Sequence, residues 1–127
     1  MKIECGKYTN TWHDGSLSTG HANSPKDMLS RLESMVLMGM DLPLGAVQRQ
    51  IASGIDIIVH LGRLRDKSRK VLEVSEILDY QDGEILVSPL YRFEETGEKD
   101  GKIQGTWRKM DDLVHTQKLL AAGYKEV

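Results

Sequence analysis

Histidine and hydroxyl side chains gather in a short segment near the N-terminus. Thr19 and His21 are two residues apart, so in an extended segment their side chains lie on the same face. A neutral imidazole placed there can donate a hydrogen bond to a nucleotide's terminal phosphate or orient an attacking water molecule. We therefore predict that His21 and Thr19 are catalytic residues of a phosphate-handling site. The alternative is a structural histidine bonded to a backbone carbonyl.

A metal site is a second interpretation of the same segment. His13, Asp14 and His21 are all possible ligands. No H-x-x-x-H or C-x-x-C spacing orders them on one face, and a catalytic zinc ion needs three protein ligands held around an open position. We therefore expect no metal site here.

The order of residues in this segment resembles a known motif. T-x-H-D-G-S at 11–16 and S-T-x-H-A-N-S-P at 18–25 are similar to the histidine box of bacterial secretion ATPases. The similarity is greatest to the CpaF-like branch, which powers tight-adherence pilus assembly. Further short matches follow in the family's order at 40–43, 50–56, 58–61, 63–66 and 68–69. The resemblance thus covers 10–127, departs from the family at Trp12 and Gly20, and leaves 1–9 as a non-family segment.

The resemblance implies a nucleotide site and an oligomer. It places His13, Asp14 and Asn23 close to bound ATP and magnesium, and it makes Arg63 and Arg65 candidates for contacts with phosphate or with a neighbouring subunit. The alternatives are a local turn at Asp14, a capping role for Asn23 and a solvated turn around the arginines. The implied partners are the other subunits of a hexamer and the inner-membrane secretion platform proteins.

The chain lacks the loop that nucleotide hydrolysis in this family requires. A G-x-x-x-x-G-K-[ST] loop holds the phosphates with its backbone amides and its lysine, and no such sequence occurs here. Whether the chain is an enzyme therefore stays open. We expect the C-terminal fragment of a secretion or pilus-assembly ATPase subunit, inactive and without bound cofactor when alone. The alternative is a non-catalytic oligomerisation or interaction module, and a metal-dependent hydrolase is a third possibility.

Composition sets the class of protein. The chain has 127 residues, which is one domain's worth, and a net charge of -2 with 28% charged residues. This balance suggests neither nucleic acid nor an anionic membrane as a partner. A single cysteine, Cys5, fits a reducing compartment, and the apolar run from Ile55 to Leu61 is too short to span a bilayer. We expect a cytoplasmic protein that is peripheral to the inner membrane through its partners.

Apolar periodicity predicts helices followed by antiparallel strands. Ser24 is a typical helix cap, Pro25 suits the first helical position and an Asp-Gly pair favours a tight hairpin turn. The expected elements are a short strand at 16–21, helices from Pro25 to Gly39 and from Pro43 to Gly54, a mostly buried strand from Ile55 to Leu61, strands at 70–78 and 84–93, a long loop at 94–102 with a return strand to Trp107, and a helical stripe from Met110 to Tyr124.

These elements and the resemblance together define the expected fold. We predict an α/β fold, the C-terminal portion of a RecA-like P-loop ATPase core, with a small antiparallel β extension from about residue 55 to 107 and a C-terminal helix. The central sheet of that core would continue upstream. The strand at 16–21 would then have lost its neighbours and would form an exposed edge that invites pairing.

Overall fold

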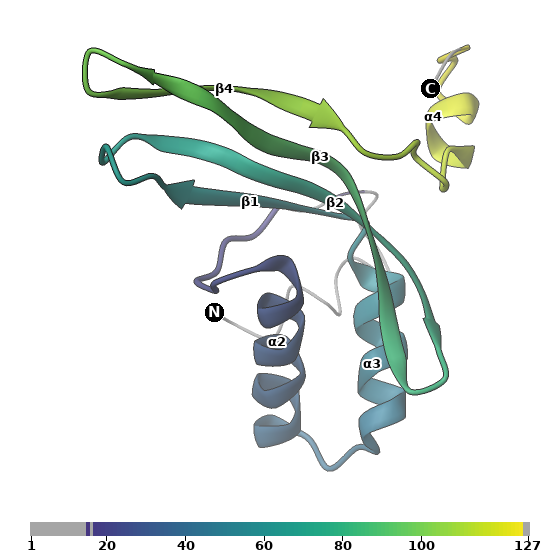
Figure 1. Cartoon of the computed structure of the whole chain (residues 1–127). Coiled ribbons are helices and arrows are strands. Elements are labelled where there is room, and N and C mark those ends of the chain that lie inside the picture. Colours follow the sequence, from purple (N-terminus) through teal and green to yellow (C-terminus); the bar gives the residue numbers. More distant parts are fainter. Residues whose placement is uncertain (1–14, 16, 126–127) are drawn as a thin grey trace.

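The structure, a computed structural model, describes residue 15 and residues 17–125. Its elements are α2 (Pro25–Gly39), α3 (Leu44–Gly54), β1 (Ile57–Arg63), β2 (Arg69–Gln81), β3 (Glu84–Lys99), β4 (Lys102–Lys109) and α4 (Gln117–Ala121). Figure 1 shows α2 and α3 side by side beneath the sheet, with the turn of the β2–β3 hairpin bent down along α3. Among the described residues, no helix combines the length and the apolar character needed to cross a bilayer.

The start of α2 follows from local capping chemistry, and this prediction is confirmed. The hydroxyl of Ser24 accepts a hydrogen bond from the backbone N–H of Asp27 at 3.1 Å, and Pro25 occupies the first turn. The carboxylate of Asp27 in turn accepts from the backbone N–H of Asn23 at 2.9 Å. These bonds satisfy donors that the first helical turn would otherwise leave without a partner. The helix ends at Gly39, as expected.

The sheet is a four-stranded antiparallel meander in the order β1-β2-β3-β4. Two of its turns carry an Asp-Gly pair with positive φ at both residues: Asp82 and Gly83 have φ of 52° and 80°, and Asp100 and Gly101 have 53° and 73°. This backbone conformation matches the twist of a tight hairpin. The loop expected at 94–102 is therefore wrong, because β3 continues to Lys99 and the second Asp-Gly pair closes the hairpin within two residues.

The core lies where the bent end of the β2–β3 hairpin meets the helices. Leu29 of α2 and Val47 and Ile51 of α3 pack against Ile77 and Ile85. Apolar surface buried in this way is the main favourable term in folding. Within the described residues only seven apolar side chains are buried, so most of the sheet lies outside the core.

Irregular pairing bends the β2–β3 hairpin toward α3. The register of the two strands shifts between Val74 and Ser75 and again between Ile77 and Tyr80. Shifts of this kind are β-bulges, which bend a strand and increase its local twist. The bend brings Tyr80 within reach of α3, where the guanidinium carbon of Arg49 lies 5.2 Å from the centre of its ring. The hairpin therefore serves both as sheet and as a wall of the core.

The predicted fold class is wrong. Every strand pair in the described part of the chain is antiparallel, whereas a RecA-like core requires a parallel sheet with helices on both faces. The antiparallel strands do occur between residues 57 and 109, but they are the main sheet here, with no parallel layer to extend. The expectation failed because apolar runs identify strands without stating their direction.

The strand expected at 16–21 is also wrong for its described residues, 17–21, which form no strand. A strand is defined by its ladder of hydrogen bonds, and this polar, glycine-bearing segment has low strand propensity of its own. The exposed edge of the sheet is therefore β1 at one side and β4 at the other.

The last helix is much shorter than predicted. The stripe from Met110 to Tyr124 predicted one helix, but α4 covers only Gln117–Ala121. The physical reason lies in β2. The carboxylate of Glu76 accepts hydrogen bonds from the backbone N–H groups of Val114 and His115 at 2.9 and 2.8 Å, which holds these residues outside a helical ladder.

The core assignment predicts unequal effects of two β-strand substitutions. Replacing Ile77, which is fully buried, by alanine should lower the free energy of unfolding by about 2–5 kcal/mol, because buried atoms are lost and a cavity remains. Val59→Ala, on an exposed side chain of β1, should change it by no more than about 0.5 kcal/mol. Urea unfolding followed by circular dichroism measures both. Equal losses would show that the bent hairpin does not pack on the helices.

Candidate functional site

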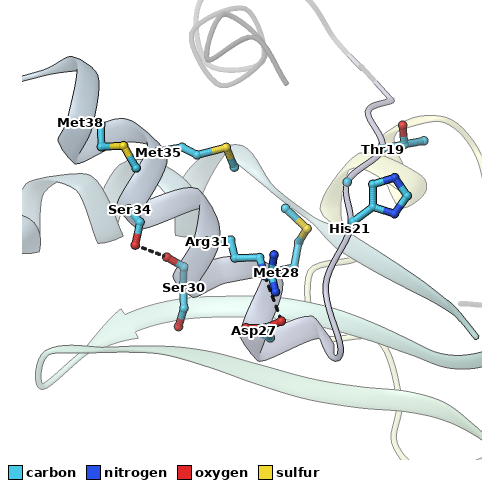
Figure 2. A pocket seen from close by; sticks show the side chains of 10 residues that line it. Thr19, His21, Asp27, Met28, Ser30, Arg31, Ser34, Met35 and Met38 are labelled. Carbon is cyan, nitrogen blue, oxygen red and sulfur yellow. Dashed lines mark hydrogen bonds and ion pairs between the residues drawn. The ribbon is translucent and has the colours of Figure 1, made fainter.

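The residues predicted to be catalytic line an open pocket beside α2. The pocket has a volume of about 860 Å³. Figure 2 shows Thr19 and His21 on the extended segment, across from methionine and serine side chains of α2. Thr19 and His21 thus both line this pocket. Both residues are exposed.

The polar groups on the α2 side of the pocket are engaged in holding the helix. The carboxylate of Asp27 accepts hydrogen bonds from the backbone N–H of Asn23 and from Nε of Arg31, the latter at 3.1 Å. The hydrogen bond from Asn23, assisted by the one from Arg31, lowers the pKa of Asp27. A carboxylate that is ionised and bonded in this way is a poor general base. The capping alternative therefore describes what the backbone of Asn23 does here.

The two arginines lie at the β1–β2 turn and do not line this pocket. Nε of Arg63 donates to the backbone carbonyl of Lys67 at 3.3 Å. The guanidinium of Arg65 donates to both carboxylate oxygens of Glu95, at 2.7 Å for Nη1, and to Glu98 at 3.5 Å. These carboxylates raise the pKa of Arg65, with Glu95 as the main cause. Arg65 therefore finds its acidic partners within its own chain.

The predicted nucleotide site is thus not assembled from its described members. Thr19 and His21 share the pocket, the backbone N–H of Asn23 bonds to Asp27 at the start of α2, and the two arginines lie at the β1–β2 turn. His13 and Asp14 lie outside the described residues. In the described part of the chain, no group of three or more His, Cys, Asp or Glu side chains could hold a metal ion. The roles assigned to these residues toward ATP and magnesium stay predictions.

Asp66 joins the turn end of the β1–β2 hairpin to the turn end of the β3–β4 hairpin. Its carboxylate accepts from the hydroxyl and the backbone N–H of Ser68 and, across the sheet, from the backbone N–H of Ile103 at 2.9 Å. The bonds from Ser68, followed by the bond from Ile103, lower the pKa of Asp66 to about 2. Together with the Arg65 pair, this contact fixes the β1–β2 turn against the β3–β4 hairpin.

An aromatic pair spans β3 and β4 within the β3–β4 hairpin. Phe93 and Trp107 meet edge to face with their ring centres 5.6 Å apart. Nε1 of Trp107 donates to the backbone carbonyl of Val71 at 2.7 Å, so the ring reaches from β4 across to β2. Aromatic pairs in this geometry stabilise beyond the area that they bury.

One face of the sheet exposes several apolar side chains, and we call it the open face. It consists of Ile57, Val59 and Leu61 of β1, Val74 of β2 and Tyr91 of β3. Directly paired residues of antiparallel strands share a face, and Val59 pairs with Val74, which pairs with Tyr91.

The exposure of the open face corrects a prediction. β1 was expected to be mostly buried, but Ile57, Val59 and Leu61 are 40%, 54% and 67% exposed. Ile58, which points to the other face, packs against the core. The alternation in the sequence identified the strand, but only the structure shows that the helices cover the side of Ile58. The open face is a feature that the sequence did not predict.

Glu76 marks where the open face ends. It pairs with Ile57 and is therefore on the same face, yet it is only 1% exposed. The segment containing Val114 and His115 crosses above it, held by the two hydrogen bonds to its carboxylate. A charged group this deeply buried needs such donors to offset its lost hydration. No pattern in the sequence singled out Glu76.

The chain resembles known proteins over part of its length. The chain is similar to two proteins named "Putative conjugal transfer protein", from the CDC 1551 / Oshkosh and the ATCC 25618 / H37Rv strains of Mycobacterium tuberculosis. The identity to each is 30% over 76 residues, which is 60% of this chain and 21% of the mycobacterial protein. The chain therefore spans about a fifth of its relatives. No family model matches it.

These findings overturn the resemblance to CpaF-like secretion ATPases. The similarity found is to conjugal transfer proteins, no ATPase family is matched, and the antiparallel sheet does not fit a RecA-like P-loop core. The histidine, serine and proline order near the N-terminus was read as a nucleotide motif. The structure instead shows that Asn23 and Ser24 serve the start of α2.

Asp66 predicts a loss of stability in acid. Its pKa is lowered in the folded chain, from 3.8 to about 2, so its contribution is present above the unfolded value and is lost as the pH falls from about 4 to about 2. Asp66→Asn should lower the unfolding midpoint at pH 7 and flatten this part of the pH profile. Asp79→Asn, at an exposed position of β2, is the control. Thermal unfolding at pH 2–7 measures both, and identical profiles would contradict the assigned bonds.

Glu76 predicts local release of the C-terminal segment. Glu76→Ala removes the acceptor of the Val114 and His115 amides, whose hydrogen bonds are part-buried; a hydrogen bond to a charged group contributes about 1.5–3 kcal/mol. We expect these two amides to exchange with deuterium faster, while the amides of α3 keep their protection. Glu84→Ala, at the exposed β2–β3 turn, should leave both unchanged. Unaltered exchange at 114 and 115 would argue against the anchor.

Proposed function

We propose that this chain is a non-catalytic interaction module of an assembly for conjugal transfer or protein secretion. The observation that carries the proposal is the open face, where exposed apolar side chains of β1 and β3 adjoin the half-buried Val74 of β2. Contiguous apolar surface of this kind marks sites of association. The chain contributes a surface to the assembly, and its neighbours cover that surface.

The small core supports the same role. A chain of 127 residues can bury roughly two-thirds of its unfolded surface, yet in the described part only seven apolar side chains are buried. The β1–β2 and β3–β4 hairpins are instead joined at their outer ends by polar contacts, including the bond from the indole N–H of Trp107 to the carbonyl of Val71. An architecture with this much uncovered sheet gains stability when a partner binds it.

The similarity to conjugal transfer proteins supports the setting. Because the chain spans only about a fifth of these relatives, the activity of the longer proteins is a separate matter. We propose that this module works in the cytoplasm, next to the inner membrane, and that its partners are further copies of itself and the platform proteins of the transfer apparatus.

A transfer assay with matched variants tests the proposal. In the organism that carries this chain, Val59→Lys should reduce conjugal transfer or secretion by at least about tenfold, because a charge at the centre of an apolar contact removes the equivalent of one important interface residue. Met38→Lys is the control, since Met38 is 83% exposed but lies on α2, away from the open face. Circular dichroism of both purified variants confirms folding.

Two outcomes would contradict the proposed function. Normal transfer by the folded Val59→Lys variant would show that the open face is not used. An equal loss in the Met38→Lys variant would shift the functional surface to the pocket beside α2, and with it to Thr19 and His21.

A further inference from the structure

The two edges of the sheet differ in how they are protected. β4 carries three cations, Lys102, Arg108 and Lys109, and all of them are exposed. Charged side chains, lysine above all, are the usual means by which an edge strand avoids pairing with another chain. β1 carries no Lys, Arg, Asp or Glu from Ile57 to Gly62. Its edge is therefore open to pairing, while the opposite edge is protected.

The backbone of β1 offers the groups that such pairing needs. The N–H of Ile77 donates to the carbonyl of Asp56 at 2.9 Å, so Asp56 faces β2. Bonded and non-bonded positions alternate along an antiparallel strand, which directs the backbone groups of 57, 59 and 61 away from β2. In the described part of the chain, no backbone hydrogen bond joins 57–63 to any segment other than β2.

We propose that β1 pairs with β1 of a second copy of this chain, antiparallel and around a twofold axis at His60. Deepening the proposed interaction role, this contact joins two four-stranded sheets into one. Val59 then lies opposite Leu61 of the second copy, and Ile57 lies opposite its Arg63. On the other face, Ile58 lies opposite Gly62. The outward backbone groups of 57, 59, 61 and 63 meet one another in this register.

The charged residues at the two ends of β1 do not oppose this pairing. Asp56 precedes β1 and Arg63 ends it, and both are exposed. Antiparallel pairing in this register places Asp56 of one copy opposite Leu64 of the other and Arg63 opposite Ile57, so no like charges meet. The pairing also brings the exposed side chains of Val59 and Leu61 from both copies together at the centre of the open face.

The contact is small, and this sets the expected affinity. β1 has seven residues, fewer than the roughly 20–30 residues that each partner contributes to a stable interface. We therefore expect a reversible dimer that dissociates on dilution, with a dissociation constant in the micromolar range. A chain that stays monomeric at every concentration would be incompatible with this pairing.

Sedimentation velocity on the purified full chain, over a wide range of concentrations, tests the dimer. Leu61→Lys should raise the dissociation constant by at least about tenfold, whereas Thr106→Lys, which adds the same charge to β4, should leave it unchanged. The double variant Val59→Glu with Leu61→Lys should restore the dimer, because each new glutamate then faces a new lysine. Registers displaced by two residues would bring like charges together and give no rescue.

A cross-link provides a second measurement that does not depend on affinity. In a Cys5→Ser background, His60→Cys places the only thiol on the proposed axis, at a non-bonded pair with a Cα separation of about 4.5 Å, which a disulfide can bridge. Oxidation should give a covalent dimer, and Thr106→Cys in the same background should not.

The outcomes separate this inference from the proposed function. A wild-type chain that is monomeric at every concentration, or a dimer indifferent to Leu61→Lys, overturns β1 pairing. If transfer nonetheless fails with Val59→Lys, the open face binds another protein and the interaction role stands. A dimer with the predicted register beside normal transfer by Val59→Lys would instead overturn the role and leave the pairing intact.

Discussion

One pair of helices has to cover a four-stranded sheet, and it is large enough for only part of one face. The β2–β3 hairpin bends at its irregular pairings so that Ile77 and Ile85 reach Leu29, Val47 and Ile51. Burial at this contact supplies the main apolar stabilisation of the described chain. Outside this contact, polar bonds hold the strands, and apolar side chains of β1 remain exposed.

Beyond the core, directional bonds replace burial. Asp66 reaches the backbone of Ile103, Arg65 reaches Glu95, and Glu76 holds the segment after β4. Each is a charged group bonded to a fixed partner, so the hairpins keep their relative positions without a second apolar layer. Exposed ion pairs alone contribute little. The bonds to backbone N–H groups therefore matter most for holding the outer strands in place.

The polar groups beside α2 and the exposed apolar side chains of β1 therefore lie in different parts of the molecule. Ser24 and Asp27 beside the pocket are occupied in starting α2, whereas Ile57, Val59 and Leu61 of β1 are exposed in the described part of the chain. A surface that folding leaves uncovered is free to bind a partner. The similarity to conjugal transfer proteins supplies a setting in which such contacts are required.

Local chemistry made part of this protein predictable. The sequence by itself determined the cap at Ser24, the end of α2 at Gly39, the start near Pro43 and the Asp82-Gly83 turn, because each depends on side chains a few residues apart. Strand direction, the missing strand before α2 and the exposed side of β1 could not be predicted in this way. Alternation identifies two faces of a strand but not which one is covered, and only the packing of α2 and α3 against Ile58 decided that Val59 remains outside.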